Sequence, residues 1–225
     1  MTDQSCVNEK RAIILLSGGL DSTTCLALAK HQGWRVWALS FDYAQRHCIE
    51  LAAAKKIAKQ YEVQAHYIVP IQLPDGHSSA LTNNELTIPR YAPHQDLVPN
   101  TYVPARNTLF LSYALGLAET IRATSIWIGC SSVDYSGYPD CRPAFIEAYQ
   151  QLANTAIPEG IQGQPVQIVA PLMSLSKAET IKLGLSLSVD YDTTISCYQA
   201  TATKPACGEC DSCQLRQQGF QQALS

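Results

Sequence analysis

The chain has 225 residues, which is enough for one domain with a large core and a small appendage. Its 16 basic and 19 acidic residues give a formal net charge of −3, so it lacks the basic surface that duplex nucleic acid binds, and we expect no nucleic-acid partner. No apolar run is long enough to span a bilayer, and the polar start from Met1 to Lys10 does not resemble a signal peptide, so we expect a cytoplasmic protein without membrane contact.

The first predicted element is a strand over Ala12–Leu16, whose apolar run is typical of a strand buried on both faces. It continues into SGGLDST at residues 17–23 and then into a helical pattern from Cys25. Gly18 and Gly19 can take positive φ and let a ligand approach the backbone, which a Cβ would prevent. Strand, glycine turn and helix start together predict amides that point at one anion, helped by the helix dipole.

The loop is not a Walker loop, because no lysine follows its glycines, and it is not a G-x-G-x-x-G dinucleotide loop. SGGLDST instead resembles the PP-loop of the ATP pyrophosphatases, which hold the diphosphate of ATP while AMP is passed to a substrate. The alternative is a plain glycine turn capped by Asp21, but strand, SGGxDS and helix stand in register, which favours the phosphate loop. The predicted ATP-binding residues are Leu16, Ser17, Gly18, Gly19, Leu20, Asp21, Ser22, Thr23, Thr24, Cys25 and Leu26.

Strands and helices alternate along the rest of the chain. Further strands are predicted over Arg35–Phe41, Gln64–Val69, Ser125–Gly129 and Val166–Ala170, with helices over Arg46–Tyr61, Asn107–Arg122, Cys141–Ala153 and Lys177–Leu185. This alternation predicts an α/β fold with a doubly wound, mostly parallel five-stranded sheet. Such a sheet binds ligands beyond the carboxyl ends of its strands, which is where SGGLDST lies. Ser176 and Glu179 predict a capping box at the start of the last helix.

Two segments leave alternatives open. The stretch from Pro70 to Pro104 has no convincing period, and a loop of this length is either a functional lid or mobile. The helix predicted after Asn107 is apolar on nearly all sides, so we expect it to be buried on most faces. That burial fits either the middle of the layer or a dimer contact.

Four cysteines crowd near the C-terminus, at Cys197, Cys207, Cys210 and Cys213. Two interlocked C-x-x-C steps bring three sulfurs together, Gly208 relieves the turn, and Cys197 can fold back as the fourth ligand. Four thiolates suit a closed structural zinc site, with a redox pair or an iron–sulfur centre as alternatives. We therefore divide the chain into a nucleotide-binding α/β domain over residues 11–185 and a zinc-binding appendage over residues 186–225.

Two further stretches carry candidate binding residues. Val133–Arg142 follows the fourth strand and combines small, polar and aromatic residues, as in sites for a planar polar ligand; a surface turn is the alternative. Arg106, within Val103–Asn107, stands just before a helix and can pair with phosphate or carboxylate. A solvated arginine at a helix start is the alternative there.

Seven segments together resemble one family. SGGLDSTT, FDYAQRH, VPARN, SGYPDCR, KAETIKLG, TISCY and CGECDSCQLR occur in the order found in the 7-cyano-7-deazaguanine synthases, the nitrile-forming enzymes of queuosine biosynthesis. The resemblance runs from about Ile13 to Phe220, and SGYPDCR with the four-cysteine tail is specific to this branch. Ala44 and Ala105 stand where relatives commonly have glycine, which predicts a slightly different turn after the second strand.

The resemblance implies an ATP-dependent ligase of the adenine nucleotide alpha hydrolase-like fold. It implies that 7-carboxy-7-deazaguanine and ammonia become the nitrile through an adenylated carboxylate and an adenylated amide, with release of AMP and diphosphate. It also implies Mg²⁺ on the phosphates, one Zn²⁺ per chain and a homodimer. No glutaminase pattern is evident, so ammonia must arrive free or from a partner protein.

The resemblance also suggests roles for single residues. Asp21 and Ser22 of the loop and the cations Arg106 and Lys177 are the candidate catalytic residues, although Lys177 can equally be a solvated helix end. A guanine-like ring presents two adjacent N–H donors, which one carboxylate can accept in parallel. Asp134 or Asp140 is the candidate carboxylate, with Tyr138 as a stacking face. The predicted substrate-binding residues are Asp134, Tyr138, Asp140 and Arg142.

Two other functions compete with this one. A tRNA-modifying ligase or thiolase can use the same adenylation, but generally needs an RNA-binding extension or a catalytic cysteine pair near the loop. A zinc-ribbon binding module with a degenerate nucleotide fold predicts no ATP turnover. The mild acidic charge argues against the first, and the intact SGGLDST against the second.

Overall fold

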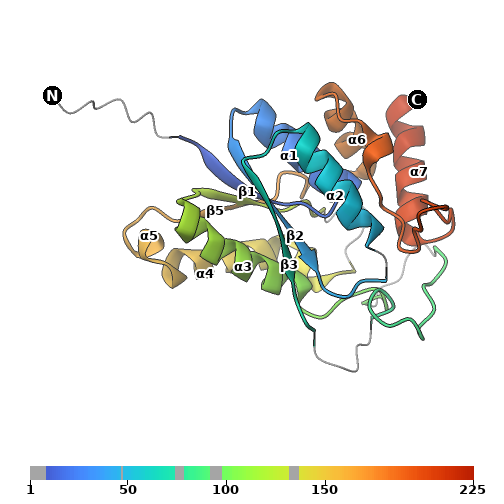
Figure 1. Ribbon diagram of the computed structural model, residues 1–225, viewed down its shortest axis with the longest axis horizontal. Helices are drawn as coiled ribbons and strands as arrows, with labels where there is room; N and C mark the ends of the chain where they lie inside the picture. The colour runs from blue at the N-terminus through green and yellow to red at the C-terminus, as the bar shows by residue number, and fades with distance from the viewer. Residues whose placement is uncertain (1–8, 47, 74–78, 92–97, 132–136) are drawn as a thin grey trace.

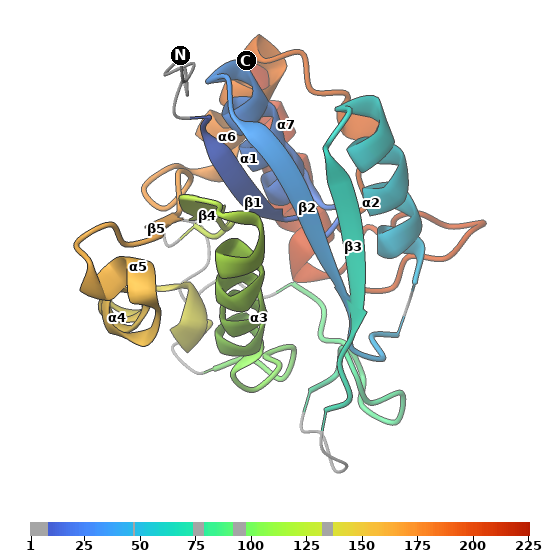
Figure 2. The same cartoon turned by 60° about the vertical axis from the view of Figure 1, so that its left-hand side comes forward.

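The structure is a computed structural model that describes residues 9–46, 48–73, 79–91, 98–131 and 137–225. Its five strands form one all-parallel sheet in the order β3-β2-β1-β4-β5, which Figure 2 shows side by side. The strands are β1 (Arg11–Leu15), β2 (Arg35–Asp42), β3 (Ala65–Pro70), β4 (Ser125–Trp127) and β5 (Gln167–Val169). The predicted α/β fold is confirmed. The strand order reverses between β1 and β4, so a ligand crevice belongs at their carboxyl ends.

Helices cover both faces of the sheet, as Figure 1 shows. Ala12 and Ile14 of β1 pack toward one pair of helices, and Ile13 and Leu15 toward the other, because side chains alternate along a strand. The first pair is α1 (Leu20–His31) and α2 (Ile49–Gln60); the second is α3 (Arg106–Ile121) and α4 (Pro143–Ala156). Among the described helices, none is long and apolar enough to cross a bilayer.

Three further helices follow α4: the short α5 (Pro158–Ile161), which the sequence did not predict, α6 (Lys177–Ser186) and α7 (Asp211–Leu224). One 3₁₀ turn (Pro139–Cys141) precedes α4 and another (Tyr191–Thr193) follows α6. The capping box of α6 is confirmed: Glu179 N–H donates to Ser176 Oγ at 3.2 Å, and Ser176 N–H donates to Glu179 Oε2 at 2.8 Å.

The C-terminal segment packs against the α/β layers through α6 and α1. Gly219 of α7 lies so close to α6 that a Cβ would come within 2.6 Å of the Lys177 side chain. The Tyr191 hydroxyl lies 2.8 Å from Thr24 Oγ1 of α1, and the Tyr191 ring meets Phe220 edge to face. These contacts join the appendage to the helix that follows the phosphate loop.

In the single chain α3 is buried along one side only, which corrects the expectation that the middle of the layer covers most of its faces, whereas the alternative of a dimer contact stays a prediction. Asn107, Leu111, Ala114, Leu115 and Ala118 are buried, and they recur at helical spacing along one side. The opposite side is open to solvent and includes Leu109, 40% exposed, and Tyr113, 49% exposed. Because apolar residues lie on all sides of α3 and only one side is packed, an apolar face remains exposed in the single chain.

The described part of the segment between β3 and α3 packs into the core without forming a helix or strand. Ala80, Leu81 and Ile88 are buried in the same apolar cluster as α3. The Arg46 side chain donates to the carbonyls of Asn83, at 2.5 Å, and Leu86. This part therefore has a defined place against the end of the sheet.

Ala44 and Ala105 both adopt the left-handed backbone conformation, with φ of 58° and 52°. A Cβ is disfavoured there, so glycine would be the less strained residue at both positions. We predict that the double variant Ala44→Gly/Ala105→Gly is more stable by about 1 kcal/mol, measured by urea unfolding.

A matched control for this prediction is Ala52→Gly on the exposed side of α2, where the backbone is helical. This change should cost about 1 kcal/mol, since glycine is a poor helix former. If both variants lose stability to the same extent, the left-handed conformation is not a source of strain.

Candidate functional site

Three adjoining cavities open at the carboxyl ends of β1, β2 and β4. The first, of about 270 Å³, is bounded by the SGGLDST loop, the end of β2 and the start of α2 and α3. The second, of about 200 Å³, shares Asp21, Arg106 and Cys130 with the first. A third, smaller cavity lies beside Gln45 and Glu50. We call these the loop chamber, the lysine chamber and the side chamber; Ser196 and Tyr198 line all three.

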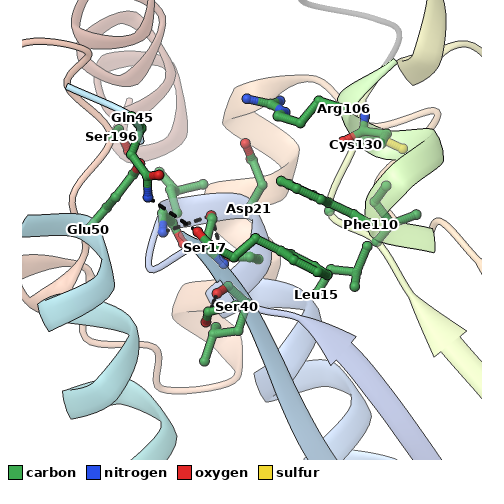
Figure 3. A pocket seen from close by; sticks show the side chains of 18 of the residues that line it. Leu15, Ser17, Asp21, Ser40, Gln45, Glu50, Arg106, Phe110, Cys130 and Ser196 are labelled. Atoms are coloured by element: carbon green, nitrogen blue, oxygen red, sulfur yellow. Dashed lines mark hydrogen bonds between the residues drawn. The ribbon is translucent and has the colours of Figure 1, made fainter. Parts of the chain in front are cut away.

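The SGGLDST loop is held by its own serines (Figure 3). Ser17 N–H donates to Ser22 Oγ at 3.2 Å, and Gly19 N–H donates to Ser17 Oγ at 3.2 Å. Gly18 has φ of +86°, and a Cβ there would meet the Glu50 carbonyl oxygen at 2.2 Å, so no other residue fits. Gly19 has φ of −86°, so of the two glycines only Gly18 uses the positive φ that both can take.

The loop leads into α1, whose first N–H groups have no acceptor within the helix. Six of the predicted ATP-binding residues line the loop chamber: Leu16, Ser17, Gly19, Leu20, Asp21 and Ser22. The other five, Gly18, Thr23, Thr24, Cys25 and Leu26, do not line it. Cys25 and Leu26 are fully buried in the core side of α1. The arrangement presents backbone N–H donors to the chamber at the positive end of a helix.

Asp21 and Lys177, two of the predicted catalytic residues, form an ion pair. Lys177 Nζ donates to both carboxylate oxygens of Asp21, at 2.7 and 2.9 Å. The Lys177 side chain is 17% exposed, and both residues line the lysine chamber. The alternative of a solvated helix end is therefore wrong, since α6 brings this lysine to the phosphate loop.

Arg106 lines all three chambers from the first turn of α3. Its guanidinium lies 5.9 Å from the centre of the Tyr43 ring and 6.0 Å from that of Phe110, and it donates to the Tyr43 hydroxyl at 3.4 Å. Aromatic rings hold the cation in place without neutralising it. The alternative of a solvated arginine is not what the structure shows.

The predicted substrate-binding residues take different places. Tyr138 lines the lysine chamber, and its hydroxyl donates to Thr101 Oγ1 at 2.9 Å. Asp140 is buried and lines none of the three chambers; its Oδ2 accepts the Asn107 N–H at 2.9 Å. Arg142 is exposed at the start of α4. Asp134 lies outside the described residues.

Glu50 and Gln45 line the loop and side chambers, and sequence reasoning missed both. Burial raises the pKa of the Glu50 carboxyl to about 7, a rise that the charge of Arg106 limits. Gln45 is fixed by its own turn, because its amide donates to Phe41 O at 3.3 Å and accepts from Tyr43 N at 2.9 Å. The signal that could have found them is that Gln45 follows the carboxyl end of β2 and Glu50 lies in the first turn of the next helix.

Cys130 and Cys141 line both the loop and the lysine chambers. Burial raises the pKa of Cys130 to about 12 and that of Cys141 to about 11. At neutral pH both are therefore thiols rather than nucleophilic thiolates. Two cysteines do lie near the loop, but the raised pKa of both thiols argues against the thiolase alternative, which needs a reactive thiolate.

The four C-terminal cysteines come together as predicted. The sulfurs of Cys197, Cys207, Cys210 and Cys213 all lie within 4.8 Å of one another. Backbone N–H groups donate to them, including Cys207 N–H to Cys197 Sγ at 3.2 Å and Cys210 N–H to Cys207 Sγ at 3.3 Å. Zinc bound at about 2.3 Å to each sulfur would separate the sulfurs by about 3.8 Å, so the donor set fits a tetrahedral metal ion.

The cysteine cluster is continuous with the chamber wall. Ser196 and Tyr198 flank Cys197 in sequence and line all three chambers. Ile195 N–H donates to Gly18 O of the phosphate loop at 3.0 Å. A metal ion that holds the four cysteines in place would therefore also hold the chamber-lining residues Ser196 and Tyr198 in place.

Comparison with known proteins gives a consistent result. The sequence profile of the family "Queuosine biosynthesis protein QueC" matches residues 11–224. A protein of Coxiella burnetii (strain RSA 331 / Henzerling II) is 58% identical over 95% of this chain and 94% of its own length, and one of Legionella pneumophila (strain Corby) is 56% identical over 95% and 93%. A third, of Saccharophagus degradans, is 51% identical over 96% of both chains. Each is named 7-cyano-7-deazaguanine synthase.

Among solved structures, the fold is similar to that of NMN synthetase from Francisella tularensis. The TM-score is 0.50 at 19% identity, over 92% of this chain and 73% of that one. A predicted subunit of a tRNA methyltransferase from Methanocaldococcus jannaschii also gives a TM-score of 0.50, at 16% identity over 78% and 74%. At these identities the likeness concerns the fold alone.

Proposed function

The chain belongs to the queuosine biosynthesis QueC family, and from that membership we propose that it is a 7-cyano-7-deazaguanine synthase. The proposed reaction joins ammonia to the carboxylate of 7-carboxy-7-deazaguanine and produces the nitrile at the expense of ATP. The observation that carries the proposal is the SGGLDST loop, which lines the loop chamber together with Arg106 and is bordered by Lys177 in the adjoining lysine chamber.

The chemistry requires two activations. The substrate carboxylate attacks the α-phosphorus of ATP, and the bond to diphosphate breaks, which gives an acyl adenylate. Ammonia then displaces AMP and forms the amide. The amide oxygen attacks a second ATP in the same way, and loss of AMP with two protons leaves the nitrile. Each activation places negative charge on a leaving diphosphate, so donors fixed in advance should stabilise it.

We assign the loop donors and two cations to that charge. The backbone N–H groups of Leu20, Asp21 and Ser22 at the start of α1 bind the diphosphate, and Lys177 and Arg106 supply positive charge from the adjoining lysine chamber. Asp21 holds the Lys177 ammonium at the loop. Mg²⁺ bound to the phosphates would neutralise part of their charge, and Asp21 is the acidic group nearest the loop to orient it.

The proposal is tested by mass spectrometry of the product. The protein is incubated with ATP, magnesium chloride, ammonium chloride and 7-carboxy-7-deazaguanine. We expect 7-cyano-7-deazaguanine, and no product when ammonium is omitted. An unchanged substrate under conditions where the protein is folded would overturn the proposal.

We further propose that the cysteine cluster holds one Zn²⁺ in a structural role. The four cysteine sulfurs would fill all four positions of a tetrahedral ion, so none would remain for a reacting water. We also assign the protein to the cytoplasm, because the odd number and scattered positions of its cysteines do not resemble a secreted disulfide framework.

We propose a homodimer that covers the exposed face of α3. Leu109 and Tyr113 lie one turn apart on it, and Leu152 of the neighbouring α4 is 46% exposed. Tyr149 of α4 donates to Ser112 of α3 at 3.0 Å, which keeps the two helices adjacent. An apolar surface of this kind favours burial against a second copy.

We predict that Tyr113→Asp converts the dimer to a monomer, measured by light scattering during gel filtration. A charge on the covered face would have to be buried without a partner. The control is Tyr67→Asp on β3, whose side chain is 40% exposed on another face. A wild-type monomer, or a dimer that survives Tyr113→Asp, would contradict this interface.

A further inference from the structure

Two acidic side chains line the three chambers among the described residues, Asp21 and Glu50. Asp21 is neutralised by Lys177. Glu50 forms none of the hydrogen bonds or ion pairs found between side chains of the described residues, although the guanidinium of Arg106 lines the same two chambers. Figure 3 shows the Glu50 carboxylate at the edge of the cavity, on the side away from Arg106.

A carboxylate in this position has capacity to accept hydrogen bonds that the protein does not fill. An ionised carboxylate has two oxygens with four lone-pair sites, and leaving them unpaired in a partly buried cavity is unfavourable. Glu50 lies in the first turn of α2, where the helix dipole favours negative charge. A ligand with two adjacent N–H donors could therefore donate hydrogen bonds to both oxygens of the Glu50 carboxylate.

We propose that Glu50 is the residue that reads the guanine-like ring, accepting its N1–H and one 2-amino N–H with the two carboxylate oxygens. This inference rests on the proposed function. It assigns recognition of the base to Glu50, because the other acidic residue of the chambers, Asp21, is already paired with Lys177. The buried Asp140 carboxylate is already bonded to the Asn107 N–H, so it is not aimed at the cavity.

The opposite ends of the cavity match the two ends of the substrate. Its ring edge carries hydrogen-bond donors, and its far side carries a carboxylate. Glu50 and Arg106 lie on different sides of the cavity, so a substrate with donors toward Glu50 can direct its carboxylate toward Arg106 and the phosphate loop (Figure 3). Tyr43 and Tyr198 line the same chambers as Glu50 and offer apolar ring surface to a planar ligand.

The same geometry discriminates against adenine. An adenine edge combines the 6-amino donor with the N1 acceptor, and the lone pair of N1 would face a carboxylate oxygen. A guanine-like edge presents donors at both positions, so an ionised Glu50 favours it. While Glu50 is ionised, this edge therefore disfavours the adenine of ATP in the substrate position.

The test combines one substitution with one change in the substrate. Glu50→Gln keeps the size of the side chain but replaces one acceptor oxygen by an NH₂ donor. The analogue 7-carboxy-7-deazahypoxanthine lacks the 2-amino group. For the wild-type protein we expect kcat/KM to be at least about 100-fold lower with the analogue than with the substrate.

For Glu50→Gln we expect this preference to fall below about tenfold, because the carboxamide accepts N1–H and donates to O6 in both compounds. Two further readouts keep the result specific: the KM for ATP should stay within about twofold of wild type, and Glu147→Gln on the exposed side of α4 should keep the full preference. An unaltered ATP KM also shows that the variant is folded.

The outcomes separate this inference from the proposed function. If Glu50→Gln lowers kcat/KM equally for both compounds, Glu50 does not read the 2-amino edge, and the synthase function stands. If Asp140→Asn rather than Glu50→Gln abolishes the preference, the base is read from the loop after β4. If wild-type protein converts neither compound, the proposed function fails, and this inference fails with it.

Discussion

Replacing Lys177 by methionine is expected to lower kcat by at least about 100-fold while the protein remains folded. The ammonium lies 2.7 Å from Asp21 and lines the chamber next to the phosphate loop, where charge grows on the leaving diphosphate. Removing one fixed donor to such charge typically costs two to three orders of magnitude in rate. Initial rates of diphosphate release measure the effect.

Lys182→Met is the matched control, because Lys182 lies on the exposed side of the same helix and should leave kcat unchanged. Asp21→Asn should lower kcat as well, and the double variant Asp21→Asn/Lys177→Met should be little worse than Lys177→Met alone, since the two residues act as a unit. Effects that multiply in the double variant would show instead that Asp21 and Lys177 act independently.

Loss of one cysteine ligand is expected to have the second largest effect. Cys210→Ser should abolish stoichiometric zinc binding and destabilise the protein by at least about 3 kcal/mol, which lowers Tm by roughly 6–12 °C. Activity should fall too, because Ser196 and Tyr198 beside Cys197 line every chamber. Elemental analysis and thermal unfolding measure the two effects.

Cys48→Ser is the control for this experiment, since Cys48 is exposed and outside the cluster. It should retain one zinc per chain and the wild-type Tm. A Cys210→Ser protein that keeps both zinc and its Tm would show that the cluster is not a four-cysteine site. Iron with inorganic sulfide in the purified protein would favour the iron–sulfur alternative.

The fold could be predicted because it depends on local patterns. Apolar runs and amphipathic periods are set by neighbours in sequence, and alternating strands and helices leave few topologies. Boundaries shifted by one to several residues: the helix expected from Cys25 begins at Leu20, and the one expected from Arg46 begins at Ile49. The exposed side of α3 could not be predicted, because an apolar composition does not show which side of a helix packs against another element of the same chain.

The site was only partly predictable, because its groups are far apart in sequence. The loop glycines and the four cysteines could be recognised directly, because each set is defined by short spacings within one segment of the sequence. The Asp21–Lys177 pair joins residues 156 positions apart, so no local pattern reports it. Asp140 looked like a ligand in sequence but caps a neighbouring segment, whereas Glu50 looked like an ordinary helix residue and faces the cavity.

The most direct test of the account is to identify what leaves ATP during turnover. With ATP labelled separately at its α- and γ-phosphorus, we predict two AMP and two diphosphate for every nitrile formed, with the γ-label in diphosphate throughout. Release of ADP and orthophosphate would contradict the account, because the phosphate loop would then not be holding a diphosphate while the substrate takes AMP.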